Sequence, residues 1–110
     1  MKELSLFLQR FGDTAKHRII DFLLENPGVD YTKAEIAKHA GISRPALYAV
    51  WKGLEKDKLV KHTRIIGRAR LFTFNKESEA GKFYYSVEMM LLKESFAAAE
   101  AMVEKQKVVA

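Results

Sequence analysis

Basic side chains are concentrated in the middle of the chain, where they have the chemistry to bind a polyanion. Between Tyr31 and Lys76 there are 11 Lys and Arg residues against three acidic ones, whereas the rest of the chain holds 8 basic and 11 acidic residues. The formal net charge of +5 therefore originates in this middle segment. Because arginine stays charged at any working pH and presents forked donors to a phosphate, the segment predicts nucleic-acid binding. A solvated surface that is simply rich in lysine is the alternative interpretation.

The sequence has no recognisable catalytic or metal-binding pattern. It contains no cysteine, which excludes disulfides, thiolate metal sites and thiol chemistry. Its three histidines, His17, His39 and His62, fall on separate predicted elements, and no nucleophile–base pair or glycine-rich phosphate loop is present. We therefore expect no enzymatic activity, no metal site and no cofactor. No uncharged apolar run approaches the roughly 20 residues that cross a bilayer, and no signal-peptide pattern is visible, so we expect a cytoplasmic, nucleoid-associated protein without a membrane partner.

The basic segment also has the pattern of two short helices joined by a tight turn. Thr32 and Glu35 have the spacing of a capping box, in which each side chain accepts from the other residue's backbone N–H. Gly41 is expected to end the first helix, because glycine adopts a left-handed backbone at little cost. Ser43 is expected to cap the second helix, which should run to about Lys56. This arrangement predicts a helix-turn-helix whose second helix is the recognition helix.

The recognition helix is predicted to have a buried side and a DNA-binding side. Leu47 and Leu54 recur with Val50 at helical spacing and should face the core. On the opposite side, Arg44 can donate to guanine O6 and N7, and Tyr48 can contact a thymine methyl group or a phosphate. The residues expected to contact DNA from this helix are Ser43, Arg44, Pro45, Ala46, Tyr48 and Lys52. From the first helix, whose N-terminal N–H groups can hold a phosphate, we expect backbone contacts by Thr32, Lys33 and Lys38.

A two-stranded hairpin is expected to follow the helices, from Leu59 to Asn75. Its turn falls near Gly67, and Phe72 and Phe74 should point to the core. Three arginines of this wing suit contact with phosphates or insertion into the minor groove, and they are Arg64, Arg68 and Arg70. A basic hairpin without a binding role is the alternative.

Apolar stripes on the two ends of the chain predict a homodimer. The segment from Lys76 to Ala110 reads as one long helix, and one of its stripes has the 3.5-residue period of paired helices. This seam consists of Tyr85, Met89, Leu92, Phe96, Ala99 and Val103, and its expected companion on a short N-terminal helix consists of Leu4, Phe7, Leu8 and Phe11. A second stripe of the long helix should pack on the chain's own domain. Between the end helices, Asp13 is expected to cap a helix that runs to about Glu25. A long helix folded back as part of a monomer's core is the alternative.

The run EIAKHAGISRPALYAVWKGLEKDKLV, followed by TRIIGRARLFTFN, resembles the winged helix-turn-helix of small ArsR/MarR-like transcriptional regulators, especially the archaeal ones. The resemblance covers about residues 13–75, and its most specific parts are Ala37, Gly41 and the exit from Leu54 through Leu59-Val60 into the wing. It implies a dimer that places two recognition helices in successive major grooves. The missing cysteines and scattered histidines do not support a metal-sensor role, and Asp57-Lys58 stands where these regulators usually have a glycine before the wing strand.

Together these patterns predict a mainly α fold with a small β-hairpin wing. We divide the chain into an N-terminal helix that contributes to dimerisation (1–12), a winged helix-turn-helix domain (13–75) and a long C-terminal dimerisation helix (76–110). The expected function is that of a sequence-specific regulator, by default a repressor, which binds a pseudo-palindromic site in double-stranded DNA as a homodimer. The alternative is a winged-helix protein–protein interaction module of a transcription-related complex. Binding of a small-molecule effector stays an open possibility, and the sequence identifies no residues for its site.

Overall fold

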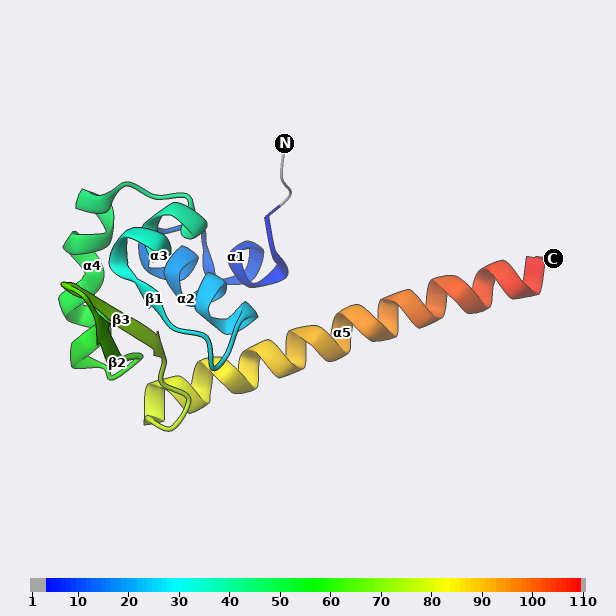
Figure 1. Ribbon diagram of the computed structural model, residues 1–110. Helices are drawn as coiled ribbons and strands as arrows, with labels where there is room; N and C mark the ends of the chain where they lie inside the picture. Colours follow the sequence, from blue (N-terminus) through cyan, green and yellow to red (C-terminus); the bar gives the residue numbers. More distant parts are fainter. Residues whose placement is uncertain (1–3, 110) are drawn as a thin grey trace.

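The computed structural model describes residues 4–109, with side chains as far as Glu104, so residues 1–3 and 110 of the predicted terminal segments lie outside the described residues (Figure 1). The elements in chain order are α1 (Leu6–Phe11), α2 (Ala15–Glu25), β1 (Tyr31–Thr32), α3 (Lys33–Ala40), α4 (Arg44–Lys56), β2 (Val60–Ile66), β3 (Ala69–Phe74) and α5 (Glu79–Val109). The predicted fold class, mainly α with a small β wing, is confirmed.

Local capping interactions set the ends of α3 and the start of α4, as predicted. Thr32 Oγ1 accepts from the backbone N–H of Glu35 at 3.1 Å, and Glu35 Oε1 accepts from the N–H of Thr32 at 2.9 Å. Gly41 ends α3 in the left-handed conformation, with a φ of 71°. Ser43 Oγ then accepts from the N–H of Ala46 at 3.2 Å, which caps α4. These short-range bonds fix the angle at which α4 leaves the turn.

The cap of α2 differs from the prediction. Thr14 is the N-cap, and its Oγ1 accepts from the N–H of His17 at 3.1 Å. Asp13 instead accepts hydrogen bonds from the guanidinium of Arg18, including one from Nη2 at 2.9 Å. A charged partner one turn into the helix therefore competes with capping for the Asp13 carboxylate.

The exit from α4 to the wing contains a strained residue. The N–H of Lys58 donates to the carbonyl of Glu55, and that of Leu59 donates to the carbonyl of Leu54, as in a Schellman motif. Lys58 has a φ of 56°, a conformation that favours glycine. This is one of the two positions where the resembled regulators usually have glycine, so the departure in sequence has a backbone consequence.

The three strands form an antiparallel sheet in the order β1-β3-β2. The β2–β3 hairpin, here called the wing, turns at Gly67, whose φ is 61°. Strand β1 pairs with β3, with Tyr31 opposite Phe72 and Thr32 opposite Leu71. The sequence predicted only the hairpin, because a two-residue strand has no alternation to detect. Strand β1 therefore ties the start of α3 to the wing.

The core lies between the helices and the inner face of the sheet. Its fully buried side chains include Ile19, Leu23, Ile36, Leu47 and Leu54 from α2, α3 and α4. Phe72 and Phe74 are buried from the sheet side, as predicted, and Trp51 of α4 packs edge-on against Phe72 with ring centroids 5.1 Å apart. Val50, predicted to face the core, is half-buried and packs against it. The contact between Trp51 and Phe72 joins α4 to the wing.

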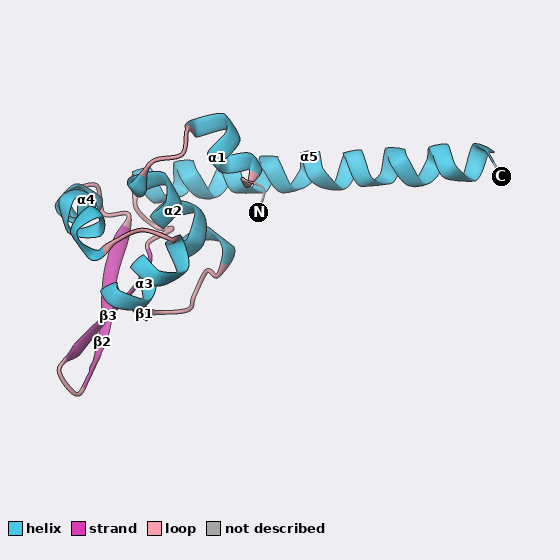
Figure 2. Cartoon of the chain, turned by 90° about the horizontal axis from the view of Figure 1, so that it is seen from above, coloured by secondary structure: helices cyan, strands magenta, loops and turns pink. Residues whose placement is uncertain are grey.

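Helix α5 extends far beyond the domain, as both views show (Figures 1 and 2). It begins at Glu79 rather than at Lys76, because Ser78 Oγ accepts from the N–H of Gly81 and so caps it. At 1.5 Å per residue its 31 residues span about 46 Å, within a longest molecular extent of 59 Å. Within residues 4–109, no helix is both long and apolar enough to cross a membrane.

Candidate nucleic-acid interface

Helix α4 presents its predicted DNA-binding side to solvent. It lies at one end of the molecule, with the wing beside it (Figure 1). Tyr48 is 56% exposed, and Arg44 and Lys52 are exposed on the same helix. The exposed residues of the predicted set also include Ser43 and Pro45, while Ala46 is half-buried. The predicted DNA-binding side of α4 is therefore mostly accessible to solvent.

Arg44 and Lys38 are brought together although they come from different helices. Both line a hollow of about 380 Å³ between α3 and α4, with Glu35 also on its wall. Lys38 is exposed in the last turn of α3, and Arg44 opens α4. The helix-turn-helix thus carries two positive charges on the side where α4 begins, which suits an anionic ligand.

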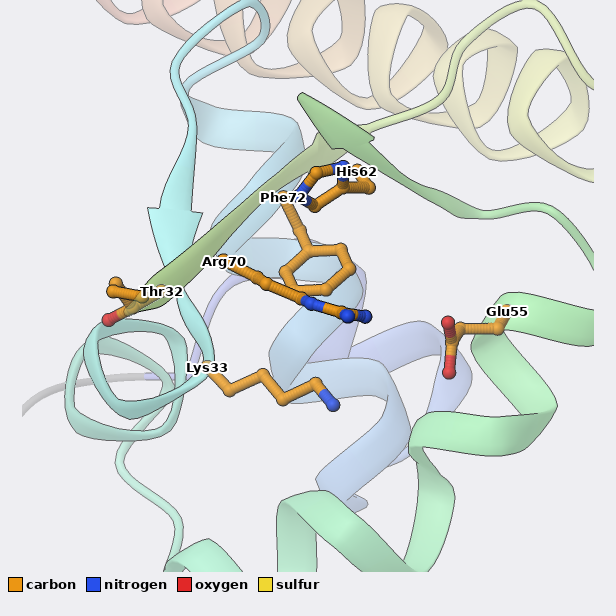
Figure 3. Close-up of a pocket in the computed structure, with 7 residues that line it drawn as sticks. Thr32, Lys33, Glu55, His62, Arg70 and Phe72 are labelled. Atoms are coloured by element: carbon orange, nitrogen blue, oxygen red, sulfur yellow. The ribbon is translucent and has the colours of Figure 1, made fainter. Parts of the chain in front are cut away.

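A second hollow, here called the helix–wing hollow, lies between α4 and the wing and has a volume of about 370 Å³ (Figure 3). It is lined by Thr32, Lys33, Glu55, His62, Ala69, Arg70 and Phe72. Figure 3 shows the side chains of Lys33 and Arg70 extending into it, with Glu55 of α4 on the facing wall. Lys33 was predicted to contact the DNA backbone and Arg70 the backbone or the minor groove, and the fold brings the two residues to one place.

The Lys33 ammonium is held by aromatic rings. Its Nζ lies 5.2 Å from the ring centroid of Trp51, and 5.5 Å from those of Tyr48 and Phe72. Such cation–π contacts contribute roughly 0.5–1 kcal/mol each at exposed sites. They aim the ammonium at the junction of α4 and β3 without neutralising its charge. The indole nitrogen of Trp51, Nε1, is buried and has no hydrogen-bond partner among the described residues. Packing alone therefore holds the indole ring.

Arg64 of the wing has a partner within the chain. Its Nε and Nη2 donate to the carboxylate of Asp30 at 2.9 and 3.1 Å, and Thr63 Oγ1 donates to the same carboxylate at 2.6 Å. The hydrogen bonds from Arg64 and Thr63 lower the pKa of Asp30 to about 2. The ladder between β2 and β3 is irregular at this point, between His62 and Arg64. Arg64 therefore ties the wing to the loop before β1.

The other two wing arginines have no such partner. Within the part of the chain whose side chains are described, Arg68 and Arg70 make no ion pair. Both are exposed, Arg68 in the turn and Arg70 in β3. Sequence reasoning treated the three wing arginines as equivalent and missed Asp30, because no local pattern links residues 34 positions apart. It missed Glu55 as well, which has the pattern of an ordinary solvated helix residue.

The predicted dimer residues are divided between the core and the surface. Phe7 and Leu8 are only 1% and 8% exposed and belong to the chain's own core, so they have little surface left for a partner. Leu4 and Phe11 are exposed on the same short segment. In the seam of α5, Tyr85 is half-buried against the core, and the residues exposed to solvent are Met89, Leu92, Phe96, Ala99 and Val103.

The second stripe of α5 packs on the chain's own domain in its first half, as predicted. Tyr84 and Val87 pack against the core and Leu91 is buried in it. From residue 92 to residue 104 every side chain is exposed, including Met102 of this stripe. Phe96 and Val103 line a shallow groove of about 370 Å³ on this half of the helix. An apolar helix surface of this length is typical of a site that another helix covers.

Comparison with known proteins identifies the fold. No family model matches the chain, and no curated protein matches it. Among solved structures, NadR in complex with 4-hydroxyphenylacetate is 24% identical, with a TM-score of 0.63, over 94% of this chain and 72% of that one. An apo form of a ZitR variant from Lactococcus lactis is 19% identical, with a TM-score of 0.59, over 86% and 75% of the two chains.

A third similar structure is MepR, a transcription regulator of the Staphylococcus aureus multidrug efflux pump MepA, at 15% identity and a TM-score of 0.60 over 86% of this chain and 68% of that one. ZitR is also described as a zinc-responsive MarR family member. The chain therefore has the winged-helix fold found in MarR-type transcription regulators, and the predicted MarR-like fold is confirmed.

Proposed function

We propose that this chain is a MarR-like regulator that binds specific sites in double-stranded DNA as a homodimer. The observation that carries the proposal is the position of the basic excess. On a fold shared with transcription regulators, it lies over the exposed side of α4, the start of α3 and the wing. A polyanion with the width of a DNA duplex is the ligand that such a surface favours.

In this proposal the N-terminal half of α4 enters the major groove. Arg44 lies in the first turn, where a long side chain can reach guanine O6 and N7, and exposed Tyr48 lies one turn further along. Lys52 contacts a phosphate. Arg68 and Arg70 of the wing contact the neighbouring backbone or the minor groove, where guanidinium groups are favoured by the negative potential.

The homodimer follows from the uncovered half of α5. A second copy can cover the exposed seam with its own seam, as in any two-fold interface. Leu4, which precedes α1, and Phe11 at the end of α1 would extend this contact, whereas Phe7 and Leu8 support it from the core. Two recognition helices about 34 Å apart would then bind the two halves of a pseudo-palindrome.

Finer features of the regulator stay predictions. Repression is the default for a small dimer that blocks polymerase, and nucleoid association follows from DNA binding. The archaeal and ArsR-like aspects also stay predictions, and the similar structures quoted with an organism come from Lactococcus lactis and Staphylococcus aureus. Ligand binding is described for two of the similar structures, since NadR was solved in complex with 4-hydroxyphenylacetate and ZitR is described as zinc-responsive. For this chain the identity of any effector stays open.

Selection of binding sites from a random duplex library, followed by mobility-shift assays, tests the proposal. We expect a two-fold symmetric consensus, and Arg44→Ala should relax the preference at one base-pair position. Arg68→Ala should weaken binding about equally across sequences, because a phosphate contact carries no base preference. If the purified chain bound no duplex at low salt, the alternative function as a protein–protein interaction module would be favoured.

A further inference from the structure

The helix–wing hollow has a charge arrangement that suits one phosphate group. We propose that Lys33 and Arg70 together seat a single phosphate of the DNA backbone, and that Glu55 opposes that phosphate and limits the affinity. This inference rests on the proposed DNA-binding function, and it assigns a role to Glu55 that the function alone does not require.

The geometry of duplex DNA brings a backbone strand to the helix–wing hollow. If α4 lies in the major groove and the wing reaches the adjacent minor groove, one phosphodiester strand must pass between them, since the backbone separates the two grooves. The hollow lies between these two elements, with Glu55 on α4 and Arg70 on the wing (Figure 3). The phosphates of that strand are therefore the nearest anions to the hollow in the complex.

The two cations are suited to hold such an anion. Lys33 is the first residue of α3, so the N-terminal dipole of that helix adds to its positive charge. The rings of Tyr48, Trp51 and Phe72 position its ammonium, and neither Lys33 nor Arg70 forms an ion pair within the described side chains. A guanidinium can donate two parallel hydrogen bonds to a phosphate while the ammonium supplies a point charge.

Glu55 is the one acidic residue that lines the hollow. In the free protein its carboxylate faces Lys33 and Arg70 across the hollow without an ion pair within the described side chains, and in the complex it would face the phosphate as a like charge. Replacing it by glutamine should therefore favour the complex over the free protein. Because solvent and salt screen charges in an open hollow, we expect a gain of about threefold to tenfold in affinity.

Neutral phosphate analogues test directly whether Lys33 and Arg70 bind one phosphate, a site here called the phosphate seat. Duplexes of the selected site would carry one methylphosphonate at a time, and their binding to the intact chain would be measured by fluorescence anisotropy. One backbone position per half-site should weaken the wild type strongly. For Lys33→Gln and Arg70→Gln the same position should have a smaller further effect than in the wild type, because each variant has already lost part of that contact.

The control variants separate this contact from general loss of charge. Arg68→Gln should weaken binding but keep the full effect of the methylphosphonate, and Lys93→Gln on α5 should behave as the wild type. Glu55→Gln, an exposed substitution that spares the core, should bind more tightly, and its gain should vanish on the neutralised duplex.

Two results would overturn the inference while leaving the proposed function intact. In the first, the affinity lost through Lys33→Gln or Arg70→Gln adds in full to the affinity lost through the methylphosphonate, whichever phosphate is replaced. The second is an affinity of Glu55→Gln equal to or weaker than that of the wild type. Failure of the wild type to bind any duplex would overturn both the proposed function and the phosphate seat.

Discussion

Replacing Phe96 by serine should dissociate the proposed homodimer. Phe96 is 67% exposed on the uncovered half of α5, at the centre of the predicted seam. An aromatic side chain buries about 200 Å² when it is covered completely, so covering the exposed two-thirds removes roughly 130 Å² from water. At about 25 cal/mol per Å² this contributes roughly 3 kcal/mol per chain and, since the two-fold contact has two copies, roughly 6 kcal/mol per dimer.

This figure is an upper bound, because association also orders side chains and part of the area can be covered again after the substitution. We expect the dissociation constant to rise at least about 100-fold, which corresponds to about 2.7 kcal/mol. Sedimentation equilibrium over a range of protein concentrations measures it. DNA affinity should fall with it, because a single chain contacts only one half-site.

Phe83 provides a matched control for Phe96. It lies on the same helix and is 57% exposed, but it is outside the 3.5-residue seam. Phe83→Ser should therefore leave the dimer intact. Equal dissociation of both variants, or of neither, would refute the assignment of the seam as the dimer contact.

Four further substitutions test the structure of the folded domain and the start of α5. Asp30 has a pKa of about 2 rather than 3.8, so it stabilises the fold above about pH 4 and loses this effect as the pH falls towards 2. Asp30→Asn should remove this part of the acid dependence in thermal unfolding. Arg64→Ala should reduce it, since the Thr63 hydroxyl still donates to Asp30, and should leave the salt slope of DNA binding unchanged. A slope reduced by about one in Arg64→Ala would instead indicate a phosphate contact. Lys58→Gly should raise the free energy of unfolding by about 1 kcal/mol in urea titrations, because it relieves the left-handed conformation, and a loss would contradict this reason. Gly81→Ala should lower it by roughly 1–3 kcal/mol, since the added Cβ would lie 1.7 Å from the backbone oxygen of Asn75, and an unchanged stability would contradict that close approach.

The helix-turn-helix could be predicted from the sequence because its determinants are local. Thr32 and Glu35 are three residues apart, Gly41 acts through its own backbone, and Ser43 caps the turn that directly follows it. The apolar spacing of α4 and the β-branched residues of the wing are likewise local patterns. Each of these signals is complete within one turn or one strand, so no knowledge of the tertiary structure is needed to use it.

The features that could not be predicted depend on tertiary contacts. Strand β1 exists because Tyr31 and Thr32 meet β3, some 40 residues later in the chain. Arg64 lies in a basic run like its neighbours, and only the fold brings it to Asp30. The cap of α2 was missed for a different, local reason: Asp13 and Thr14 are both good caps, and Arg18, five residues after Asp13, donates to the Asp13 carboxylate. The partition of the N-terminal stripe between core and surface also required the structure.

The helix–wing hollow combines both kinds of information. Lys33 and Arg70 were predicted separately as DNA contacts, one from each element. Their convergence with Glu55 became visible only when α3, α4 and β3 were placed together (Figure 3). The sequence could identify the charges, but the fold determines which of them line the same hollow.

A salt titration of binding to a selected duplex tests the central claim most directly. Six or more phosphate contacts predict that affinity falls by roughly a thousandfold between 50 and 200 mM salt, and anisotropy at saturation should give two chains per duplex. Affinity that hardly changes over this range, or the absence of binding at 50 mM, would contradict the account of this chain as a dimeric DNA-binding regulator.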